Sequence, residues 1–425
     1  MLDIRLFRTD PQLIKENIRK KFQDDKLPMV DEIIDLDKKL RETKGEVETL
    51  RNQRNVASKE IGGLMRQGKK DEAEKLKTEI AGIGSRITEL TELESELDDQ
   101  IRSRILLIPN IIDESVPLGR DDSENVEVAR YGEPLVPAYE IPYHVEIMEK
   151  LNGIDLESAR KTSGNGFYYF LGDIARLHSA ILTYARDFMI DKNFTYCIPP
   201  YMIRSNVVTG VMSFAEMENM MYKIEGEDLY LIGTSEHSMI GKFIDSIIEP
   251  GQLPQTLTSY SPCFRKEVGA HGIEERGVYR IHQFEKQEMI VVCEPEDSAD
   301  WFHKLYSYTV EFFRTLDIPV RTLECCSGDL ADLKVKSIDV EAWSPRQQKY
   351  FEVGSCSNLG DAQARRLGIR IRGENGNYFA HTLNNTVVAP PRMLIAFLEN
   401  NLNEDGSVNI PEPLRMYMGG KPVIK

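Results

Sequence analysis

Residues 264–288 of this 425-residue chain read FRKEVGAHGIEERGVYRIHQFEKQE. Side chains at both ends of this stretch alternate in a way that predicts two antiparallel strands joined by a loop at residues 268–278. The strands bring Arg265, Glu267 and Phe284 onto neighbouring positions. An arginine fork matches phosphate oxygens, a carboxylate accepts from an amine or hydroxyl, and a ring face stacks on a purine. The stretch therefore predicts a nucleotide site, and we expect its glycine-rich loop to close over the ligand.

An isolated Arg-x-Glu is also common in surface hairpins, where ion pairs contribute little to stability. The complete stretch is more specific, because it resembles motif 2 of the class II aminoacyl-tRNA synthetases. Its form is similar to that of the seryl-tRNA synthetases, with Val268-Gly269 after the Arg-x-Glu and His282-Gln283-Phe284-Glu285-Lys286 on the return strand. The resemblance extends over the whole chain, and it implies a ligase that uses ATP to join L-serine to serine tRNA.

Length and composition predict a soluble protein with either two domains or one large domain and an appendage. The chain is too long for one compact core, and it is 41% hydrophobic and 29% charged. It holds no apolar run of about 18 residues that could span a bilayer, and its first residues do not resemble a secretion signal. We therefore expect a cytoplasmic protein with no membrane association. The 6 cysteines lack paired metal-ligand spacing, which favours reduced thiols.

Charge is distributed unevenly along the chain. The formal net charge of -16 argues against a nucleic-acid partner, because proteins approach nucleic acid through basic surfaces. Between Lys38 and Lys77, however, twelve basic residues stand against seven acidic ones. The chain is thus locally basic although it is strongly acidic as a whole.

The basic segment coincides with a predicted helical arm. From about residue 31 to residue 108 there is no proline, and apolar residues recur with heptad spacing in two runs. The repeating positions include Ile33, Leu40, Val47, Leu76, Ile83, Leu90 and Leu97. Gly62-Gly63 and Gly68 interrupt the pattern, so we expect the chain to turn back there and the helices to pair antiparallel. Each run of about 35 residues would reach roughly 50 Å.

A coiled-coil arm judged on its own favours a role in oligomerisation or as a spacer. The basic residues near its turn favour contact with a phosphate backbone, and the resemblance implies that the arm lies against the long variable arm and elbow of the tRNA. Phosphate contacts would supply affinity while RNA shape supplies selection. The predicted tRNA contacts are Arg51, Arg54, Lys59, Arg66, Lys69 and Lys70.

A proline-rich connector that begins at Pro109 ends the helical pattern. We therefore predict a tRNA-binding domain at residues 1–110, with its arm at about residues 30–108, and a catalytic domain at residues 111–425. The short β-rich runs of the second domain are seldom separated by crossover helices, which favours an antiparallel sheet flanked by helices. The predicted fold class is α+β.

The catalytic domain contains a helix and strand that resemble motif 1 of the same family. An amphipathic helix is predicted over residues 174–192, and it leads into a strand that ends at Pro199-Pro200. In the family this motif forms the dimer interface, so the resemblance implies a homodimer.

Three further stretches resemble parts of the family's active site. Thr234 and Glu236 match a Thr-x-Glu that meets the amino acid, although Thr234 would also suit the cap of a helix starting near Ser235. Glu352 matches a glutamate that holds magnesium and ATP, and oxygen ligands are those that magnesium prefers. Residues 382–392 resemble motif 3, with Arg392 reaching the γ-phosphate. This motif departs from the usual small residues at Pro390-Pro391, but proline is tolerated in a first helical turn.

The resemblance implies a role for each of these residues. The implied ATP site comprises Arg265, Lys266, Glu267, Ile281, Phe284, Glu352, Val353, Gly354, Ser355 and Arg392. The implied serine site comprises Thr234, Ser235, Glu236, Arg265, Glu288 and Thr386. Arg265 and Arg392 would be the catalytic residues, and Glu352 would hold Mg²⁺. Because no nucleophile with a paired base accompanies these groups, we expect catalysis by positioning and charge stabilisation.

Two alternative functions remain compatible with the sequence. A class II-like ligase could charge a carrier protein or small molecule, although the basic arm argues against this. A non-catalytic RNA-binding paralogue could keep the arm, although the retained Arg265, Glu352 and Arg392 argue against that. The sequence also leaves open whether the tRNA for selenocysteine is a second substrate.

Overall fold

The computed structural model describes residues 1–267 and 277–425, and these fall into two compact units. One unit spans Leu2–Pro109, and the other comprises Asn110–Lys425 together with Met1. The predicted loop closure over a ligand concerns residues 268–276, which lie outside the described residues. In the described part of the chain, no helix combines the length and apolarity needed to cross a lipid bilayer.

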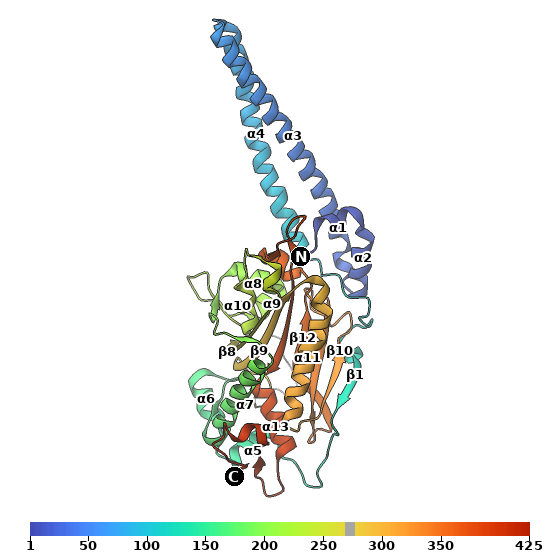
Figure 1. The fold of residues 1–425 in the computed structure, drawn as a ribbon, viewed down its shortest axis with the longest axis vertical. Helices are drawn as coiled ribbons and strands as arrows, with labels where there is room; N and C mark the ends of the chain where they lie inside the picture. Colours follow the sequence, from blue (N-terminus) through green and yellow to red (C-terminus); the bar gives the residue numbers. More distant parts are fainter. Residues whose placement is uncertain (268–276) are drawn as a thin grey trace. The chain divides into compact units, whose positions relative to one another are not determined.

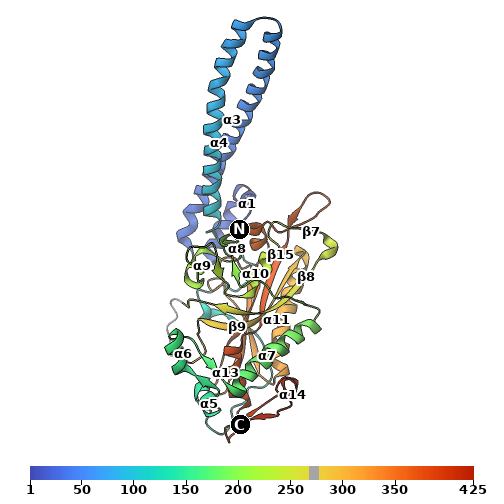
Figure 2. The ribbon, with the colours of Figure 1, turned by 90° about the vertical axis from the view of Figure 1, so that its left-hand side faces the viewer.

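The N-terminal unit is helical throughout its secondary structure. Its helices are α1 (Ile4–Thr9), α2 (Pro11–Lys20), α3 (Leu27–Arg66) and α4 (Lys70–Ile105). The Asp10 carboxylate accepts from the backbone N–H of Leu13 at 3.0 Å, and Pro11 occupies the first turn, so both residues favour the start of α2. The long helices α3 and α4 pack side by side along their length, as Figures 1 and 2 show from two directions.

An apolar seam joins α3 to α4. Ile33 and Val47 of α3 are buried, as are Leu90 and Leu97 of α4. Nearer the turn Ala73 is also buried, but the larger seam side chains, such as Leu64 and Leu76, are only partly buried. Ion pairs flank the seam, such as Arg86 with Glu46 at 3.1 Å. The predicted antiparallel helical hairpin is therefore confirmed. It is stabilised because its heptad rows remove one apolar stripe of each helix from water.

The position of the turn differs from the prediction. Gly62 and Gly63 do not interrupt the helix; they lie inside α3, which continues to Arg66. The chain reverses at Gln67-Gly68-Lys69, where Gly68 adopts a φ of 79°, a conformation that glycine accepts without a steric penalty. Gly62 and Gly63 keep helical geometry because the flanking helix on both sides outweighs the modest helix-weakening effect of a glycine.

The C-terminal unit is built on an eight-stranded sheet with the order β1-β10-β11-β12-β15-β9-β8-β4. In chain order these strands are β1 (Val126–Tyr131), β4 (Thr195–Tyr196), β8 (Gln255–Phe264), β9 (Gln283–Cys293), β10 (Val320–Glu324), β11 (Lys336–Ser344), β12 (Lys349–Asn358) and β15 (His381–Val388). Among the described strands of this sheet, every neighbouring pair is antiparallel except β4 and β8. The predicted antiparallel sheet and α+β class are confirmed.

Smaller elements surround this sheet. The short strands are β2 (Ile154–Asp155), β3 (Tyr169–Phe170), β5 (Met202–Ile203), β6 (Tyr230–Leu231), β7 (Ile247–Ile248), β13 (Arg370–Ile371), β14 (Tyr378–Phe379), β16 (Val408–Asn409) and β17 (Val423–Ile424). The helices are α5 (His144–Lys150), α6 (Leu156–Ser163), α7 (Gly172–Asp191), α8 (Ser205–Val211), α9 (Phe214–Met220), α10 (Ser235–Gly241), α11 (Ser298–Thr315), α12 (Ala362–Leu367), α13 (Pro390–Asn401) and α14 (Glu412–Arg415). Both ends of α7 lie within two positions of the bounds predicted for the motif 1 helix, residues 174–192.

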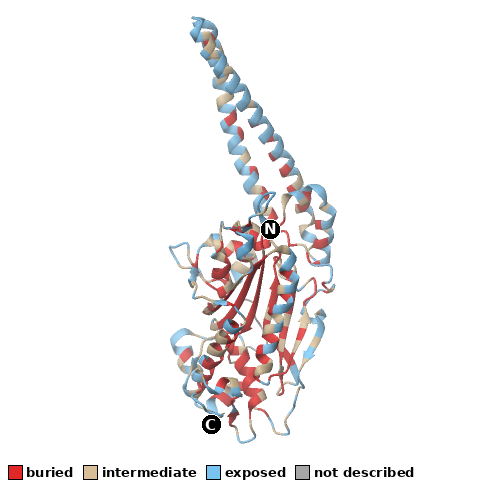
Figure 3. Cartoon of the chain, in the orientation of Figure 1, coloured by how far each residue is buried: buried red, intermediate tan, exposed pale blue. Residues whose placement is uncertain are grey.

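Strand β9 separates the core from the polar face of the sheet. Met289 and Val291 join the apolar core formed with α7, α11 and α13, and the central strands are buried in Figure 3. Because side chains alternate across a strand, Lys286 and Glu288 face the other side, where they line a cavity. Further along the same face, Ile290 packs in a second apolar cluster that includes residues of α10.

The predicted hairpin at motif 2 is shorter than its sequence pattern suggests. The regular pairing of β8 with β9 ends where Phe264 pairs with Gln283. Beyond that point Arg265 still donates to the carbonyl of His282 at 2.9 Å, but the next amide, of Lys266, donates to the carbonyl of Met220 at 2.9 Å. The chain therefore leaves the sheet at residue 266, and Glu267 adopts a φ of 49°.

Candidate active site

A cavity of about 350 Å³ lies on the polar face of the sheet. Its wall combines residues from β9, β12, β15, α10 and α13 with the segments that extend β8 and β9. Thirteen of the residues predicted from sequence line it, namely Thr234, Glu236, Arg265, Glu267, Ile281, Phe284, Glu288, Glu352, Val353, Gly354, Ser355, Thr386 and Arg392. The fold thus brings together groups that are separated by as many as 158 positions in the sequence.

Two predicted site residues do not line this cavity. Ser235 is fully buried at the start of α10. Lys266 points toward the segment around α9, where its Nζ donates to the carbonyl of Glu218 at 3.4 Å. The exit of the chain from the sheet at this residue explains why its side chain diverges from that of Arg265.

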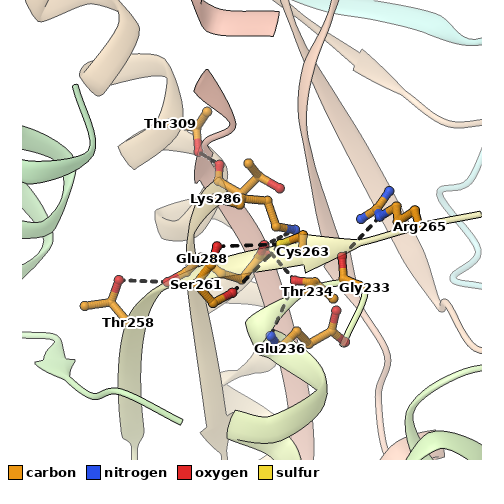
Figure 4. A network of polar contacts seen from close by, with 11 residues as sticks. Gly233, Thr234, Glu236, Thr258, Ser261, Cys263, Arg265, Lys286, Glu288 and Thr309 are labelled. Carbon is orange, nitrogen blue, oxygen red and sulfur yellow. Dashed lines mark hydrogen bonds and ion pairs between the residues drawn. The ribbon is translucent and has the colours of Figure 1, made fainter. Parts of the chain in front are cut away.

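Arg265 is held in the cavity wall by the loop that precedes α10. Its Nε donates to the carbonyl of Gly233 at 3.1 Å (Figure 4). Its guanidinium carbon lies 5.3 Å from the centroid of the Phe284 ring. Among the described residues the bond to Gly233 is the one hydrogen bond of the guanidinium, and it uses one of five donors. The arginine is therefore oriented by the protein while keeping donors for an anionic ligand.

Arg392 and Glu352 form an ion pair on another part of the wall. The Arg392 Nη1 lies 2.9 Å from the Glu352 Oε2, and the guanidinium carbon lies 4.7 Å from the centroid of the Tyr279 ring. Burial disfavours the charged form of Glu352, but the positive charges of Arg392, Lys334 and Arg265 together outweigh it and lower the pKa of this carboxyl. Pro390 and Pro391 occupy the first turn of α13, where a missing N–H costs no hydrogen bond, so the double proline is compatible with Arg392 in the cavity wall.

Thr234, Lys286 and Glu288 form a buried polar cluster (Figure 4). The Thr234 hydroxyl donates to the Glu288 Oε2 at 3.2 Å, and the Lys286 ammonium pairs with the same oxygen. The Thr234 oxygen also accepts from the backbone N–H of Glu236 at 3.4 Å, so it caps α10. Thr234 therefore caps α10, as one of its two predicted roles required, and it also contacts the Glu288 carboxylate in the cavity wall.

Two titratable groups of α10 lie beside this cluster. Burial, followed by the nearby Glu288 carboxylate, raises the pKa of Glu236 to about 7, while a hydrogen bond from Gln363 at 2.9 Å opposes the rise. Burial, followed by the positive charges of Arg265 and Lys286, lowers the pKa of His237 to about 3. Near neutral pH the cavity thus holds a neutral imidazole and a carboxyl poised between its two forms.

The strand of motif 3 is anchored from behind. Asn385 is fully buried, and its Nδ2 donates to the carbonyl of Leu305 at 2.7 Å and to the hydroxyl of Thr309 at 2.8 Å. The Thr309 hydroxyl in turn donates to the carbonyl of Thr386 at 2.7 Å. These bonds fix β15 against α11, so the side chain of Thr386 is presented to the cavity on the opposite face.

Several cavity residues were not predicted from the sequence. Lys286 lies two positions from Glu288 on one strand, and this spacing could have identified it. Arg280 lies 3.5 Å from Glu267 in an ion pair, and Tyr279 lies under Arg392. The lining also includes His237 and Lys334, for which no local pattern was available.

The predicted tRNA contacts lie in the other unit of the chain. Four of them are on α3, Lys69 is in the turn and Lys70 begins α4. The six side chains are all exposed in that unit; they are Arg51, Arg54, Lys59, Arg66, Lys69 and Lys70.

Comparison with known proteins identifies relatives over the full length of the chain. Residues 1–112 match the model of the seryl-tRNA synthetase N-terminal domain, and residues 220–401 match that of the class II tRNA synthetase core domain (G, H, P, S and T). The serine–tRNA ligase of Methanoculleus marisnigri is 40% identical over 100% of both chains, and that of Methanospirillum hungatei is 42% identical over 99% of both.

Solved structures show the same relationship. Seryl-tRNA synthetase from Pyrococcus horikoshii, complexed with ATP, superposes with a TM-score of 0.94 at 39% identity, covering 100% of this chain and 99% of that one. The cytoplasmic enzyme of Naegleria fowleri, complexed with AMP, gives a TM-score of 0.89 at 33% identity, again covering 100% and 99%. Because the similarity is this high and includes both units, the chain belongs to the seryl-tRNA synthetase family of class II aminoacyl-tRNA synthetases.

Proposed function

We propose that this chain is a serine–tRNA ligase that activates L-serine with ATP and transfers it to serine tRNA. The observation that carries the proposal is the single cavity in which Arg265 and Arg392 lie with Glu236 and Glu288. Its cationic groups suit the phosphates of a nucleotide, and its carboxylates suit the ammonium and hydroxyl of a small amino acid.

The reaction proceeds in two steps. In the first, a carboxylate oxygen of serine attacks the α-phosphorus of ATP, and the bond to the β-phosphate oxygen breaks to release pyrophosphate. In the second, a ribose hydroxyl of the terminal adenosine of the tRNA attacks the serine carbonyl, and AMP leaves. Arg265 stabilises the charge that develops on the α-phosphate, while Arg392 contacts the γ-phosphate and steadies the leaving pyrophosphate.

The remaining nucleotide contacts come from the motif 2 segments and from β12. Phe284 stacks on the adenine, Ile281 lines the base, and Glu267 contacts the nucleotide. Val353, Gly354 and Ser355 lie beside them in the lining of the same cavity. A side chain at Gly354 would place its Cβ 3.3 Å from the carbonyl oxygen of Thr386, so glycine allows the close approach of these two segments.

Glu352 is suited to a magnesium ion. It lines the cavity, and its donors are carboxylate oxygens, as magnesium prefers. The lowered pKa of Glu352 keeps its carboxylate ionised at neutral pH. When bound, magnesium would neutralise part of the phosphate charge of ATP.

Serine selection is assigned to the cluster around α10 and β9. Glu236 receives the ammonium group, while Glu288, Thr234 and Thr386 surround the hydroxyl. A site that hydrogen-bonds a substrate hydroxyl rejects the analogue that lacks it by ~10⁴-fold or more, because buried polar groups are then left unpaired. Alanine is thereby rejected because it lacks the hydroxyl. Threonine is rejected because the pocket has no room for its extra methyl group. Ser235 does not line the cavity, so we assign it an indirect role, as a buried residue of the first turn of α10.

Three further features of the proposal rest on family resemblance. The exposed basic residues of α3, the turn and α4 contact the tRNA backbone. The segment of α7 and β4 forms the interface of a homodimer, which sedimentation equilibrium would test. The protein acts in the cytoplasm, where its tRNA substrate is used.

Serine-dependent exchange of labelled pyrophosphate into ATP tests the first step. Transfer of labelled serine to tRNA tests the second. Exchange without transfer would favour a ligase that charges a carrier protein or small molecule, and absence of both would favour a non-catalytic RNA-binding protein.

A further inference from the structure

Gln363 is a buried glutamine that reaches the cavity wall from α12. Its side chain is 1% exposed. The Nε2 donates to the Glu236 Oε1 at 2.9 Å and to the carbonyl of Val211 at 3.2 Å, and the Oε1 accepts from the Thr382 hydroxyl at 2.7 Å. These three contacts use both hydrogens and the oxygen of the amide.

The partners of Gln363 determine which way its amide faces. A carboxylate and a backbone carbonyl are both acceptors, so the amide NH₂ must point toward Glu236 and Val211. The reversed amide would set its oxygen against two other oxygens. The Thr382 hydroxyl completes the arrangement by donating to the amide oxygen, so the donor aimed at Glu236 is fixed from three directions.

We propose that Gln363 is a positioning residue that orients the Glu236 carboxylate for the ammonium group of serine and favours its ionised form. This inference rests on the proposed function, because it takes Glu236 as the ammonium ligand. The structure records no partner among the described residues for the second oxygen of Glu236, and this residue lines the cavity. One oxygen is therefore held by the protein, and the other remains for the substrate.

The charges around Glu236 make this contact important near neutral pH. Glu288 and Lys286 face it from β9, Arg265 from the segment after β8, Lys334 from the segment before β11, and His237 from its own helix. Burial and Glu288 raise its pKa to about 7, whereas Gln363, Lys286 and Lys334 oppose that rise. Only the ionised form attracts an ammonium group, so serine binding should weaken as pH falls through about 7.

The test is the pH dependence of the KM for serine in pyrophosphate exchange, from about pH 6 to about pH 9. Replacing Gln363→Met removes the donor at similar volume, so the pH at which KM rises should move upward by about one unit. At pH 7 this gives a KM about fivefold higher, and the difference disappears at high pH. Gln363→Glu should shift the profile further, because a second carboxylate repels the first. The KM for ATP should change less than about twofold in both variants.

Gln287→Met is the matched control. Gln287 is a fully buried glutamine on β9 whose Nε2 donates to the hydroxyl of Thr258 at 2.7 Å, and it does not line the cavity. This variant also loses a buried hydrogen bond, but it should keep the pH profile of the unaltered chain. An unchanged profile in Gln363→Met, or an equal shift in both glutamine variants, would overturn the positioning role.

A further variant covers the case in which Gln363→Met does not fold. Thr382→Val removes only the hydroxyl that orients the amide, so it should shift the profile in the same direction by a smaller amount; no shift would reject the proposal. The unaltered chain tests the proposed function separately. If it shows no serine-dependent exchange, the proposed function fails, whereas normal exchange with unshifted variants contradicts the role of Gln363 alone.

Discussion

At the scale of single residues, the buried ion pair of Lys286 with Glu288 is the most constrained part of the site. Their side chains are 8% and 2% exposed, and the Thr234 hydroxyl donates to the same Glu288 oxygen. A buried charge is costly when its partner is removed, so this pair tolerates loss of either member poorly. The arrangement also concentrates both protein donors on one oxygen of Glu288, which orients the carboxylate.

Glu288→Gln should reduce the preference for serine over alanine. The neutral amide keeps the shape of the side chain and can still accept from Lys286, but it is a weaker acceptor than the carboxylate for the serine hydroxyl. Because the counter-charge of Lys286 is lost, thermal unfolding first establishes that the variant is folded. We expect the ratio of kcat/KM for serine to that for alanine to fall by ~10²-fold, which corresponds to about 3 kcal/mol. Pyrophosphate exchange with each amino acid measures the ratio. A ratio that stays within about twofold of the original would remove Glu288 from the specificity role.

Arg392→Lys should impair ATP use more than serine binding. Lysine retains the charge but loses the planar group that lies over Tyr279 and pairs with Glu352. We expect kcat/KM for ATP in exchange to fall by ~10²-fold, with the KM for serine changed less than about threefold. Arg372→Lys is the control, because Arg372 pairs with Glu249 at 2.6 Å on the surface and does not line the cavity. Equal effects in the two variants would contradict a role at the phosphates.

The sequence identified some site residues and missed others for physical reasons. Thr234, Glu288 and Arg392 lie in short patterns whose types and spacing indicate a chemistry. Gln363 has no such signal, since its contact with Glu236 spans 127 positions and depends on how α12 packs. Lys266 was assigned to the cavity from the motif, but the structure directs its side chain to Glu218, because the chain leaves the sheet there.

At the scale of elements, the hydrophobic pattern predicted correctly whether each long element is a helix or a strand. It was less successful at predicting the residues where those elements end. The heptad rows identified α3 and α4, and the amphipathic stripe identified α7. The end of α3 was misplaced because glycines were read as breaks, although a helix supported by packing on its partner passes through Gly62 and Gly63. The ends of β8 and β9 were misplaced because alternation continues where backbone hydrogen bonds go elsewhere.

Charge reversal near the arm's turn should separate the two steps of the reaction. Lys69→Glu with Lys70→Glu places negative charge at two exposed positions that we assign to tRNA phosphates. We expect the KM for tRNA to rise by about tenfold or more, with serine-dependent exchange unchanged. Lys38→Glu with Lys39→Glu, also exposed on α3, makes the same charge change far from the turn and should have a smaller effect. Loss of exchange in the first variant would contradict this division of labour.

At the scale of the whole molecule, the residues of the cavity and the predicted tRNA contacts belong to different compact units. The C-terminal unit contains the complete cavity lining and its own apolar core. The N-terminal unit buries its own seam and needs no cavity residue for it. Each unit therefore has the internal contacts expected of an independent domain.

Removal of residues 2–109 should leave amino-acid activation while abolishing efficient transfer. The remaining chain keeps every residue of the cavity wall, so we expect serine-dependent exchange within about tenfold of the full chain. Charging of tRNA should fall by ~10²-fold or more, since the assigned phosphate contacts are gone. Thermal unfolding of the shortened chain establishes that it is folded. A folded, shortened chain that charges tRNA normally would contradict the role of the arm.

The seam between α3 and α4 is deeply buried at Ile33, Val47, Leu90 and Leu97, whereas toward Gly68 its large apolar side chains are only partly buried and the small Ala73 is buried. Local opening costs less free energy where fewer apolar contacts must be broken, so amide hydrogen exchange should accelerate progressively along both helices toward the turn. The last helical turns of the hairpin should then open more readily than the turns at its other end. Such turns can adapt to the contour of an RNA surface, and the entropy lost when they become ordered makes binding weaker but more readily reversible.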